Sequence, residues 1–317
     1  MKKAIITGVK GQDGSYLAEL LLSKGYEVHG IVRRETIENN EKFKNIEKIR
    51  DKIIIHEGSI NEYLNIYKIF TKVMPDECYH LSAPSFVNYS FSDDFQTMNN
   101  SFNSTHYLLS TIKEVKKDCK FYFAGSSEMF GEPLVSPQNE NTPFNPKSIY
   151  GISKVSSHYL VKNYRERERI FASTGIMYNH ESPRRGSHFV TKKIISTAVK
   201  IKKGLAEDLF LGNLDVKRDW GYAPDYVTGM WQILQQEIPD DFILSTGRLH
   251  SVKEFLEYAF GYLGLDYKKH VKVNQKFFRA SEINPLCGDS SKIKKIIGWE
   301  STKSLKDIII EMIENEY

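Results

Sequence analysis

Short apolar runs alternate with amphipathic segments along the first half of the chain. The apolar runs, which are candidate strands, cover residues 3–6, 27–32, 53–56, 77–81, 120–124 and 170–177. The amphipathic segments, which are candidate helices, cover residues 15–24, 41–50, 64–72, 102–115 and 148–164. This alternation is typical of parallel strands joined by helical crossovers. The pattern therefore predicts an α/β fold with a doubly wound parallel sheet covered by helices on both faces.

The pattern changes after about residue 177. A loop rich in Ser, Pro, Arg and Gly at 182–187 leads to a candidate helix at 191–203 and then to short mixed elements. Two amphipathic, structural helices are expected at 289–297 and 305–314. We therefore predict a first domain formed by 1–177, with later returns at roughly 212–245, and a smaller mixed α/β lobe formed mainly by 178–317.

The composition is that of an ordinary globular protein. Of the 317 residues, 40% are hydrophobic and 26% are charged, and the formal net charge is +4. No apolar stretch approaches the ~18 residues of a membrane span, and Met-Lys-Lys runs directly into a short apolar strand without a hydrophobic leader. We expect a soluble, cytoplasmic protein with neither a membrane nor a nucleic acid as its partner, because the positive charge is mild and scattered. Three scattered cysteines, Cys78, Cys119 and Cys287, match neither a disulfide framework nor a metal site.

A glycine-rich loop follows the first predicted strand and opens a helix. Gly8, Gly11 and Gly14 have the spacing G-x-x-G-x-x-G. Glycines let the backbone approach a pyrophosphate, and the helix N-terminus offers unpaired N–H groups. We expect this loop, including Gln12 and Asp13, to hold a dinucleotide cofactor on a Rossmann-type sheet. A glycine-rich turn without a ligand is the alternative.

The end of the second predicted strand selects between the two nicotinamide cofactors. An acid there binds the ribose 2′-hydroxyl of NAD, whereas arginine accommodates the 2′-phosphate of NADP. Here the strand ends in Arg33 and Arg34, whose guanidinium groups suit a phosphate, although Glu35 follows directly. The sequence favours NADP over NAD.

A Tyr and a Lys four residues apart form the candidate catalytic pair. Tyr150 and Lys154 would share one face of a helix, where the cation favours the phenolate and makes it a base. Ser126, Ser127 and Glu128 precede the pair and add hydroxyls and a carboxylate. A chance match of Tyr-x-x-x-Lys is the alternative, and only the cofactor loop in the same chain argues against it.

The loop from Thr7 to Glu19, together with Tyr150-x-x-x-Lys154, resembles the extended short-chain dehydrogenase/reductases and, within them, the GDP-mannose 4,6-dehydratase family. Three further stretches sharpen the resemblance, which spans nearly the whole chain. They are Asn179-His-Glu-Ser-Pro-Arg-Arg-Gly186, Leu211-Gly-Asn-Leu-Asp-Val-Lys-Arg-Asp-Trp-Gly221 and Gly288-Asp-Ser-Ser-Lys292.

This resemblance implies a hydro-lyase that uses a tightly bound NADP regenerated in every turnover. Tyr150 would take the proton of the sugar 4-hydroxyl while hydride leaves C4, and Lys154 would lower the pKa of Tyr150 and hold the nicotinamide ribose. Ser126 would relay the proton, and Glu128 would remove the C5 proton and help to expel water from C6. Hydride returns to C6 and leaves a 4-keto-6-deoxy sugar.

The resemblance also implies the substrate contacts and the assembly. Asn179, Val190, Lys193, Arg218 and Arg279 match positions that hold GDP, and Glu282 matches one near its ribose. Arg184 and Arg185 lie in a loop that in relatives reaches across a subunit interface toward a neighbouring cofactor, so Arg185 is a cofactor candidate and a homotetramer is expected.

Several positions depart from the family pattern. Ser82-Ala-Pro-Ser-Phe86 stands where Ala-Ala-Gln-Ser-His is usual, Gly125-Ser126 where Ser-Thr is usual, and Gly58-Ser59 where a Gly-Asp pair contacts adenine. The sugar of the GDP-sugar is therefore open between mannose and a relative such as a heptose. A C4 oxidoreductase or epimerase on the same scaffold is the enzymatic alternative, and a dinucleotide-binding scaffold without activity is the other.

Overall fold

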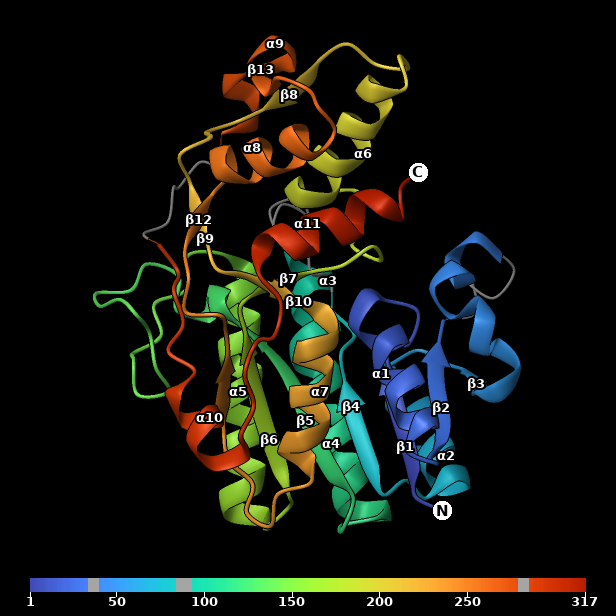
Figure 1. Cartoon of the computed structure of the whole chain (residues 1–317). Helices are drawn as coiled ribbons and strands as arrows, with labels where there is room; N and C mark the ends of the chain where they lie inside the picture. Colours follow the sequence, from blue (N-terminus) through green and yellow to red (C-terminus); the bar gives the residue numbers. More distant parts are fainter. Residues whose placement is uncertain (34–39, 84–92, 279–284) are drawn as a thin grey trace.

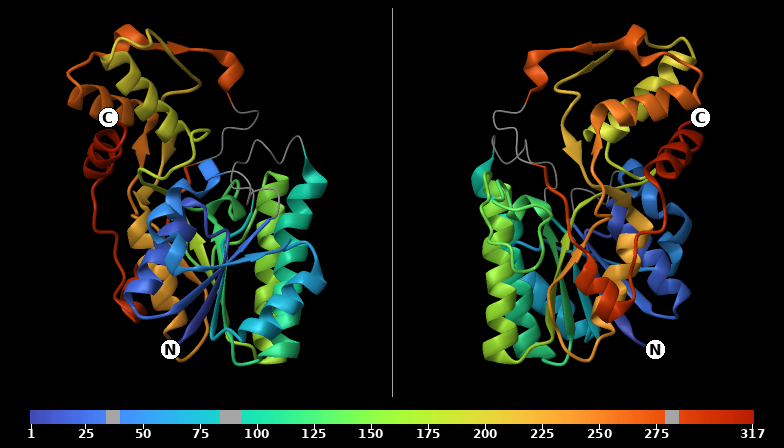
Figure 2. Two further views of the ribbon diagram at one scale, coloured as in Figure 1. Left: turned by 90° about the vertical axis from the view of Figure 1, so that its right-hand side faces the viewer. Right: turned by 60° about the vertical axis from the view of Figure 1, so that its left-hand side comes forward.

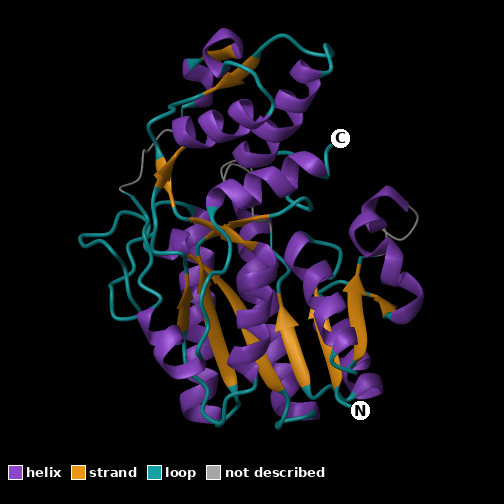
Figure 3. Cartoon of the chain, in the orientation of Figure 1, coloured by secondary structure: helices purple, strands orange, loops and turns teal. Residues whose placement is uncertain are grey.

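The computed structural model describes residues 1–33, 40–83, 93–278 and 285–317. It shows one part built around a twisted sheet and a second, mostly helical part beyond one end of the sheet (Figure 1). When the ribbon is coloured by secondary structure, the long strands fall in the first part, and only short strands lie elsewhere (Figure 3).

The sheet has seven strands in the order β3-β2-β1-β4-β5-β6-β11, and every neighbouring pair is parallel. The strands are β1 (Lys3–Thr7), β2 (Glu27–Val32), β3 (Ile54–Glu57), β4 (Glu77–His80), β5 (Lys120–Ser126), β6 (Ala172–Met177) and β11 (Phe242–Leu244). The first six strands confirm the predicted fold class, and their order is that of dinucleotide-binding sheets. The order reverses between β1 and β4, which leaves a crevice beyond the carboxyl ends of these strands.

Residues of the central strands alternate between two hydrophobic cores because successive side chains of a strand point to opposite faces. In β1, Ala4 and Ile6 belong to one core and Ile5 to the other. The first core is covered by α1 (Gln12–Ser23), the 3₁₀ helix η2 (Asn40–Lys52) and α7 (Ala223–Leu234). The second core is covered by α2 (Tyr63–Val73), α4 (Ser104–Val115) and α5 (Ile149–Glu168). The turned views show helices on both faces of the sheet (Figure 2).

The second part has a hydrophobic core of its own, formed mainly by α6, α8 and α11. Its elements are α6 (Val190–Lys202), β8 (Leu209–Leu211), α8 (Val252–Tyr262), α9 (Tyr267–His270), β13 (Val271–Val273), the 3₁₀ turn η6 (Gln275–Phe277) and α11 (Leu305–Glu314). Short strand pairs lie between the two parts, namely β7 (Asn179–Glu181) with β10 (Trp220–Tyr222) and β9 (Lys217–Arg218) with β12 (His250–Ser251). The chain also returns to the sheet late, because α10 (Ser291–Ile297) packs on β11, and Ile293 and Trp299 join the first core.

One helix begins well before its predicted start. The sequence predicts a helix over 102–115, whereas α3 (Asp94–Met98), a π-helical turn at Asn99–Asn103 and α4 follow one another without a break. Asparagine and serine are weak helix formers, so the segment gives no helical signal of its own. A π-helical turn inside a helix is common near functional sites, and Asn100 lines the cavity described below.

Among the residues that the structure describes, no helix combines the length and the apolar character that crossing a bilayer requires.

Candidate active site

A cavity of about 1100 Å³ opens at the carboxyl ends of the strands, where the strand order reverses. Its wall includes the loop after β1, the ends of β2, β4, β5 and β6, and residues of α5, α6 and β7. Every described residue that the sequence predicts to be catalytic or to bind the cofactor or the substrate lines it, namely Gly8, Gly11, Gln12, Asp13, Gly14, Arg33, Ser126, Glu128, Tyr150, Lys154, Asn179, Arg185, Val190, Lys193 and Arg218. Three other candidates, Arg34, Arg279 and Glu282, lie outside the described residues.

The loop after β1 has the shape that its glycines predict. Gly8 adopts a φ of +77°, and a Cβ on Gly14 would lie 2.2 Å from the carbonyl oxygen of Gly8. Gly11 is the N-cap of α1 and offers no side chain to cap the first N–H groups of the helix. A tight backbone that brings uncapped N–H groups to a cavity wall fits the pyrophosphate of a dinucleotide.

A buried hydrogen-bond chain ties this loop to β4. The hydroxyl of Thr7 lies 2.8 Å from Nδ1 of His80 and accepts hydrogen bonds from the backbone N–H groups of Leu81 and Ser82. On the other side of the ring, Nε2 of His80 lies 3.1 Å from the hydroxyl of Ser104 on α4. Burial lowers the pKa of His80 to about 3, so the ring is neutral. Through its two hydrogen bonds the neutral ring links β4 to Thr7 and to Ser104.

Three of the four predicted catalytic side chains lie together because α5 packs closely on the turn after β5. A Cβ on Gly151 would lie 2.6 Å from the carbonyl oxygen of Glu128, so only a glycine lets the helix approach this far. Ser126 ends β5, its hydroxyl accepts a hydrogen bond from the N–H of Glu128 over 3.3 Å, and its side chain hydrogen-bonds to Tyr150. A phenol, a hydroxyl and a carboxylate therefore meet at one point of the cavity wall.

Lys154 lies one turn further along α5 and is buried. Its Nζ donates a hydrogen bond to the carbonyl oxygen of Ala124 over 2.7 Å and lies 5.8 Å from the ring centre of Tyr150. Burial lowers the pKa of Lys154 to about 7. The ammonium is therefore poised to lose its proton near neutral pH.

The pKa of Tyr150 departs from the expected direction. Burial raises the pKa of Tyr150 to about 12 and the charge of Glu128 adds to the rise, against the hydrogen bond of Ser126 and the charge of Arg185. The sequence predicted a pKa lowered by Lys154, but in this structure desolvation disfavours the charged form of both groups. Making the phenol a base therefore requires a further positive charge in the cavity.

Gln12 and Asp13, both expected to contact a cofactor, also join the loop to β7. Nε2 of Gln12 donates to the carbonyl oxygen of His180 over 3.1 Å, and a carboxylate oxygen of Asp13 lies 2.9 Å from Nε2 of His180. Burial acts to raise the pKa of Asp13, but the charge and hydrogen bond of His180 outweigh it and lower that pKa. Burial likewise acts to lower the pKa of His180, and Asp13 outweighs it and raises that pKa. The two side chains thus form an ion pair between a buried imidazole and a partly buried carboxylate.

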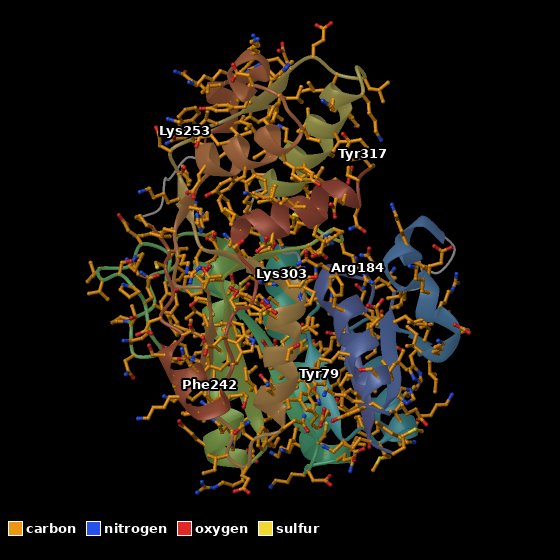
Figure 4. All side chains as sticks on the ribbon, viewed as in Figure 1. Tyr79, Arg184, Phe242, Lys253, Lys303 and Tyr317 are labelled. Atoms are coloured by element: carbon orange, nitrogen blue, oxygen red, sulfur yellow. The ribbon has the colours of Figure 1, made fainter. Side chains whose placement is uncertain are left out.

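The two arginines of the loop after β7 are held within their own chain. Arg184 donates to Ser15 and Glu19 of α1 over 3.0 and 2.6 Å, and it lies beside the end of that helix (Figure 4). Arg185 pairs with Glu181 over 3.1 Å and stacks on the ring of Phe189 at 3.5 Å. Both side chains line the cavity from this position.

The predicted substrate residues line the cavity where the second part of the chain covers it. Lys193 donates to the carbonyl oxygen of Phe210 over 2.6 Å, and its Nζ lies 4.3 Å from the ring centre of Phe277. Arg218 lies on β9 and donates to the carbonyl oxygen of Lys217 over 2.8 Å. Cationic and aromatic side chains thus meet at this end, a combination that suits a nucleoside diphosphate.

Sequence reasoning missed several residues that line the cavity. They are Lys10, Asn45, Asn100, His180, His188 and Phe277. Lys10 lies between two of the cofactor-loop glycines and His180 lies inside a quoted family stretch, so their positions were signals that could have found them. Asn45 and Asn100 have no such signal, because the tertiary structure alone brings them to the cavity.

Comparison with protein families places this chain in a known group. A family model described as GDP-mannose 4,6 dehydratase matches residues 5–312. The GDP-mannose 4,6 dehydratase 1 of Arabidopsis thaliana is 42% identical over 99% of this chain and 90% of its own length. The human GDP-mannose 4,6 dehydratase is 41% identical over 98% of this chain and 90% of its own length. The GDP-mannose 4,6-dehydratase of Vibrio cholerae is 39% identical over 98% of this chain and 93% of its own length.

Solved structures of low sequence identity share the fold. A UDP-glucose 4-epimerase from Thermotoga maritima, solved with UDP-glucose, has a TM-score of 0.87 at 22% identity and covers 99% of this chain and 98% of its own. A dTDP-glucose 4,6-dehydratase from Streptomyces venezuelae, solved with NAD and TYD, has a TM-score of 0.85 at 18% identity and covers 99% of this chain and 96% of its own. RMD from Pseudomonas aeruginosa, solved with NADPH, has a TM-score of 0.83 at 18% identity and covers 100% of this chain and 97% of its own. They confirm the Rossmann-type fold.

Gly14→Ala is expected to lower the free energy of unfolding by about 3 kcal/mol, because the new methyl group meets the carbonyl oxygen of Gly8. Gly261→Ala is the matched control: this glycine lies in α8, a Cβ there meets nothing within 4 Å, and the change should be neutral or stabilising by about 0.5–1 kcal/mol. Urea unfolding of both variants measures the difference. Equal stability of Gly14→Ala and the wild type would contradict the close packing of the loop.

Asp13→Asn is expected to destabilise the chain by about 3 kcal/mol near pH 6 and by less at pH 9. The raised pKa of His180 contributes stability that is fully present below its ordinary value of 6.5 and is lost as the pH rises through the native value. The lowered pKa of Asp13 contributes stability that is present above its ordinary value of 3.8 and is lost at more acidic pH. The loss should therefore be largest between these two ordinary values.

Urea unfolding at several pH values tests this window. Asp118→Asn, which removes an exposed carboxylate 3.1 Å from Lys116, is the control and should cost less than about 1 kcal/mol. A loss in Asp13→Asn that does not change between pH 6 and pH 9 would show that the pair is not charged.

Proposed function

Because the chain belongs to the GDP-mannose 4,6-dehydratase family, we propose that it uses NADP to convert GDP-mannose, or a close GDP-sugar such as a GDP-manno-heptose, to the GDP-4-keto-6-deoxy sugar. Membership of this family makes the chain an enzyme of the dehydratase type, a hydro-lyase. The observation that carries the proposal is the single cavity in which Ser126, Glu128, Tyr150 and Lys154 face the glycine loop.

Tyr150 acts as the base toward the sugar 4-hydroxyl. It accepts that proton, and Ser126, which is hydrogen-bonded to Tyr150, holds the sugar oxygen and relays the proton. Lys154 holds the nicotinamide ribose and keeps a donor beside the phenol. When bound, NADP supplies the redox chemistry, removing hydride from C4 and returning it to C6, and the positive charge of its oxidised ring favours the phenolate of Tyr150.

Glu128 distinguishes a dehydratase from an epimerase. A ketone at C4 acidifies the proton at C5, and a carboxylate beside the reacting carbons can remove it while water leaves C6. The turn Ser127–Met129 holds Glu128 next to Tyr150 on the cavity wall. An epimerase needs no base at C5, so this carboxylate supports dehydration.

The second part of the chain binds the nucleotide. Asn179, Val190, Lys193 and Arg218 line the cavity opposite the glycine loop and hold GDP. Lys193 and Arg218 supply the positive charge that a diphosphate requires. In this proposal residues 1–177, with returns at roughly 212–245, bind NADP, and residues 178–317 mainly bind the GDP-sugar.

NADP is proposed over NAD because Arg33 follows β2 and lines the cavity. A guanidinium at the end of the second strand suits a ribose 2′-phosphate, whereas NAD binding calls for an acid. The solved relatives with this fold include one with NADPH and one with NAD, so the fold alone does not select the cofactor.

A homotetramer, arranged as a dimer of dimers, completes the proposal. The loop with Arg184 and Arg185 follows β7 and lines the cavity, and we propose that a neighbouring subunit packs beside this loop. Light scattering of the purified chain measures the assembly.

Mass spectrometry of GDP-sugars incubated with the purified chain and NADP tests the activity. GDP-mannose, a GDP-manno-heptose and other GDP-sugars are compared, and the substrate is expected to lose one water with no net consumption of cofactor. An unchanged mass for the whole panel would overturn the proposed function, whereas an isomer of unchanged mass but altered retention would identify an epimerase.

Glu128→Gln is expected to keep C4 oxidation and to lower dehydration at least a hundredfold, because the amide cannot accept the C5 proton. A transient rise in NADPH absorbance reports oxidation, and exchange of the C5 hydrogen with D₂O reports the base. Glu132→Gln, which changes a carboxylate that pairs with Lys147 over 3.0 Å, is the control and should be as active as the wild type. Dehydration by Glu128→Gln at the wild-type rate would exclude the assigned role.

A further inference from the structure

Lys10 lies inside the glycine loop, between Val9 and Gly11, and lines the same cavity as Arg33. The loop follows β1 and Arg33 follows β2, and these two strands pair in parallel with Thr7 opposite Ile31. Because adjacent parallel strands end at the same edge, Lys10 and Arg33 leave the sheet side by side. Two cations on segments that follow neighbouring strands thus line the same cavity, at the edge of the sheet where such folds bind the ribose end of a dinucleotide.

The 3₁₀ helix η2 supports Lys10 through two of its residues, Asn45 and Phe43. Nδ2 of Asn45 donates a hydrogen bond to the backbone carbonyl of Lys10 over 3.0 Å. Nζ of Lys10 lies 4.9 Å from the ring centre of Phe43, a buried residue in the same core as α1. The side chain of Lys10 therefore lies against an aromatic ring while the residue lines the cavity.

The chemistry of this pair fits a phosphate monoester. A ribose 2′-phosphate carries close to two negative charges near neutral pH, so one guanidinium neutralises only part of it. An arginine offers two parallel donors and a lysine adds a compact point charge, and the two together match such a group. The 2′-hydroxyl of NAD has no charge and gains nothing from the second cation.

We propose that Lys10 and Arg33 together hold the 2′-phosphate of NADP, so that Lys10 is a second determinant of the cofactor preference. This inference rests on the proposed function, because it requires that the cavity bind a nicotinamide dinucleotide. It assigns to the glycine loop a role in selecting the cofactor, in addition to its role in accommodating the pyrophosphate.

Fluorescence titration of the full chain with NADPH and with NADH tests the proposal. Lys10→Gln should weaken NADPH binding about tenfold, the effect of losing one charge-assisted contact, and leave NADH binding within about twofold of the wild type. Lys10→Arg keeps the cation and should retain most of the preference for NADPH. Thermal unfolding of each variant confirms that the chain is folded.

Arg50→Gln is the matched control. The Arg50 guanidinium also stacks on Phe43, at 4.3 Å, but Arg50 is outside the set of described residues that line the cavity. NADPH binding to Arg50→Gln should equal that of the wild type.

Two results would overturn the inference while the proposed function stands. In the first, Lys10→Gln binds NADPH as tightly as the wild type; in the second, it loses NADPH and NADH equally, which would place Lys10 on the part that both cofactors share. A wild-type chain that binds neither dinucleotide would overturn the proposed function itself, and this inference with it.

Discussion

The parallel pairing of β1 with β2 on one side and with β4 on the other determines where every group of the cavity lies. Thr7, the last residue of β1, is opposite Ile31 and also opposite His80. The chain therefore leaves β2 and β4 in different directions and opens a crevice at this point. The glycine loop fills the base of that crevice, and the hydrogen bonds of Thr7 to His80, Leu81 and Ser82 fix its distance from β4.

Burial of charge is the cost of this arrangement, and hydrogen-bonded partners offset it. Asp13 and His180 pair beside the glycine loop, and the ring of His180 stacks on Tyr226 at 4.5 Å. The pair joins α1, which follows the glycine loop, to β7, which lies between the two parts of the chain. A neutral pair of the same shape could fill this space. A charged pair also requires its two groups to stay in contact, and we infer that it fixes the position of α1 relative to β7.

Local pattern predicted most of the sheet and little of what connects the two parts. Five of the first six strands, all but the edge strand β3, are largely buried on both faces and stand out as short runs, whereas β11 has only three residues and lies among polar segments. The strand pairs β7–β10 and β9–β12 have two or three residues each and partners far away in the sequence, so no periodicity marks them. The same contrast holds in the site: Tyr150 and Lys154 share a local motif, whereas Asp13 and His180 are 167 residues apart and only the tertiary structure pairs them.

The electrostatics of the two proposed bases favour an order of events. Glu128 raises the pKa of Tyr150, and a phenolate beside a carboxylate is repelled by it, so the two negative charges oppose each other in a buried site. Once Tyr150 has taken the proton of the 4-hydroxyl it is neutral, and the repulsion at Glu128 disappears. The carboxylate then stands alone beside a sugar whose C5 proton the new ketone has acidified. Oxidation before elimination is thus the order that the substrate chemistry requires and also the order in which the two side chains interfere least. This electrostatic coupling depends on the close approach of α5 to the turn that holds Glu128, which Gly151 allows. A wider separation of Tyr150 and Glu128 would remove both the coupling and the shared site.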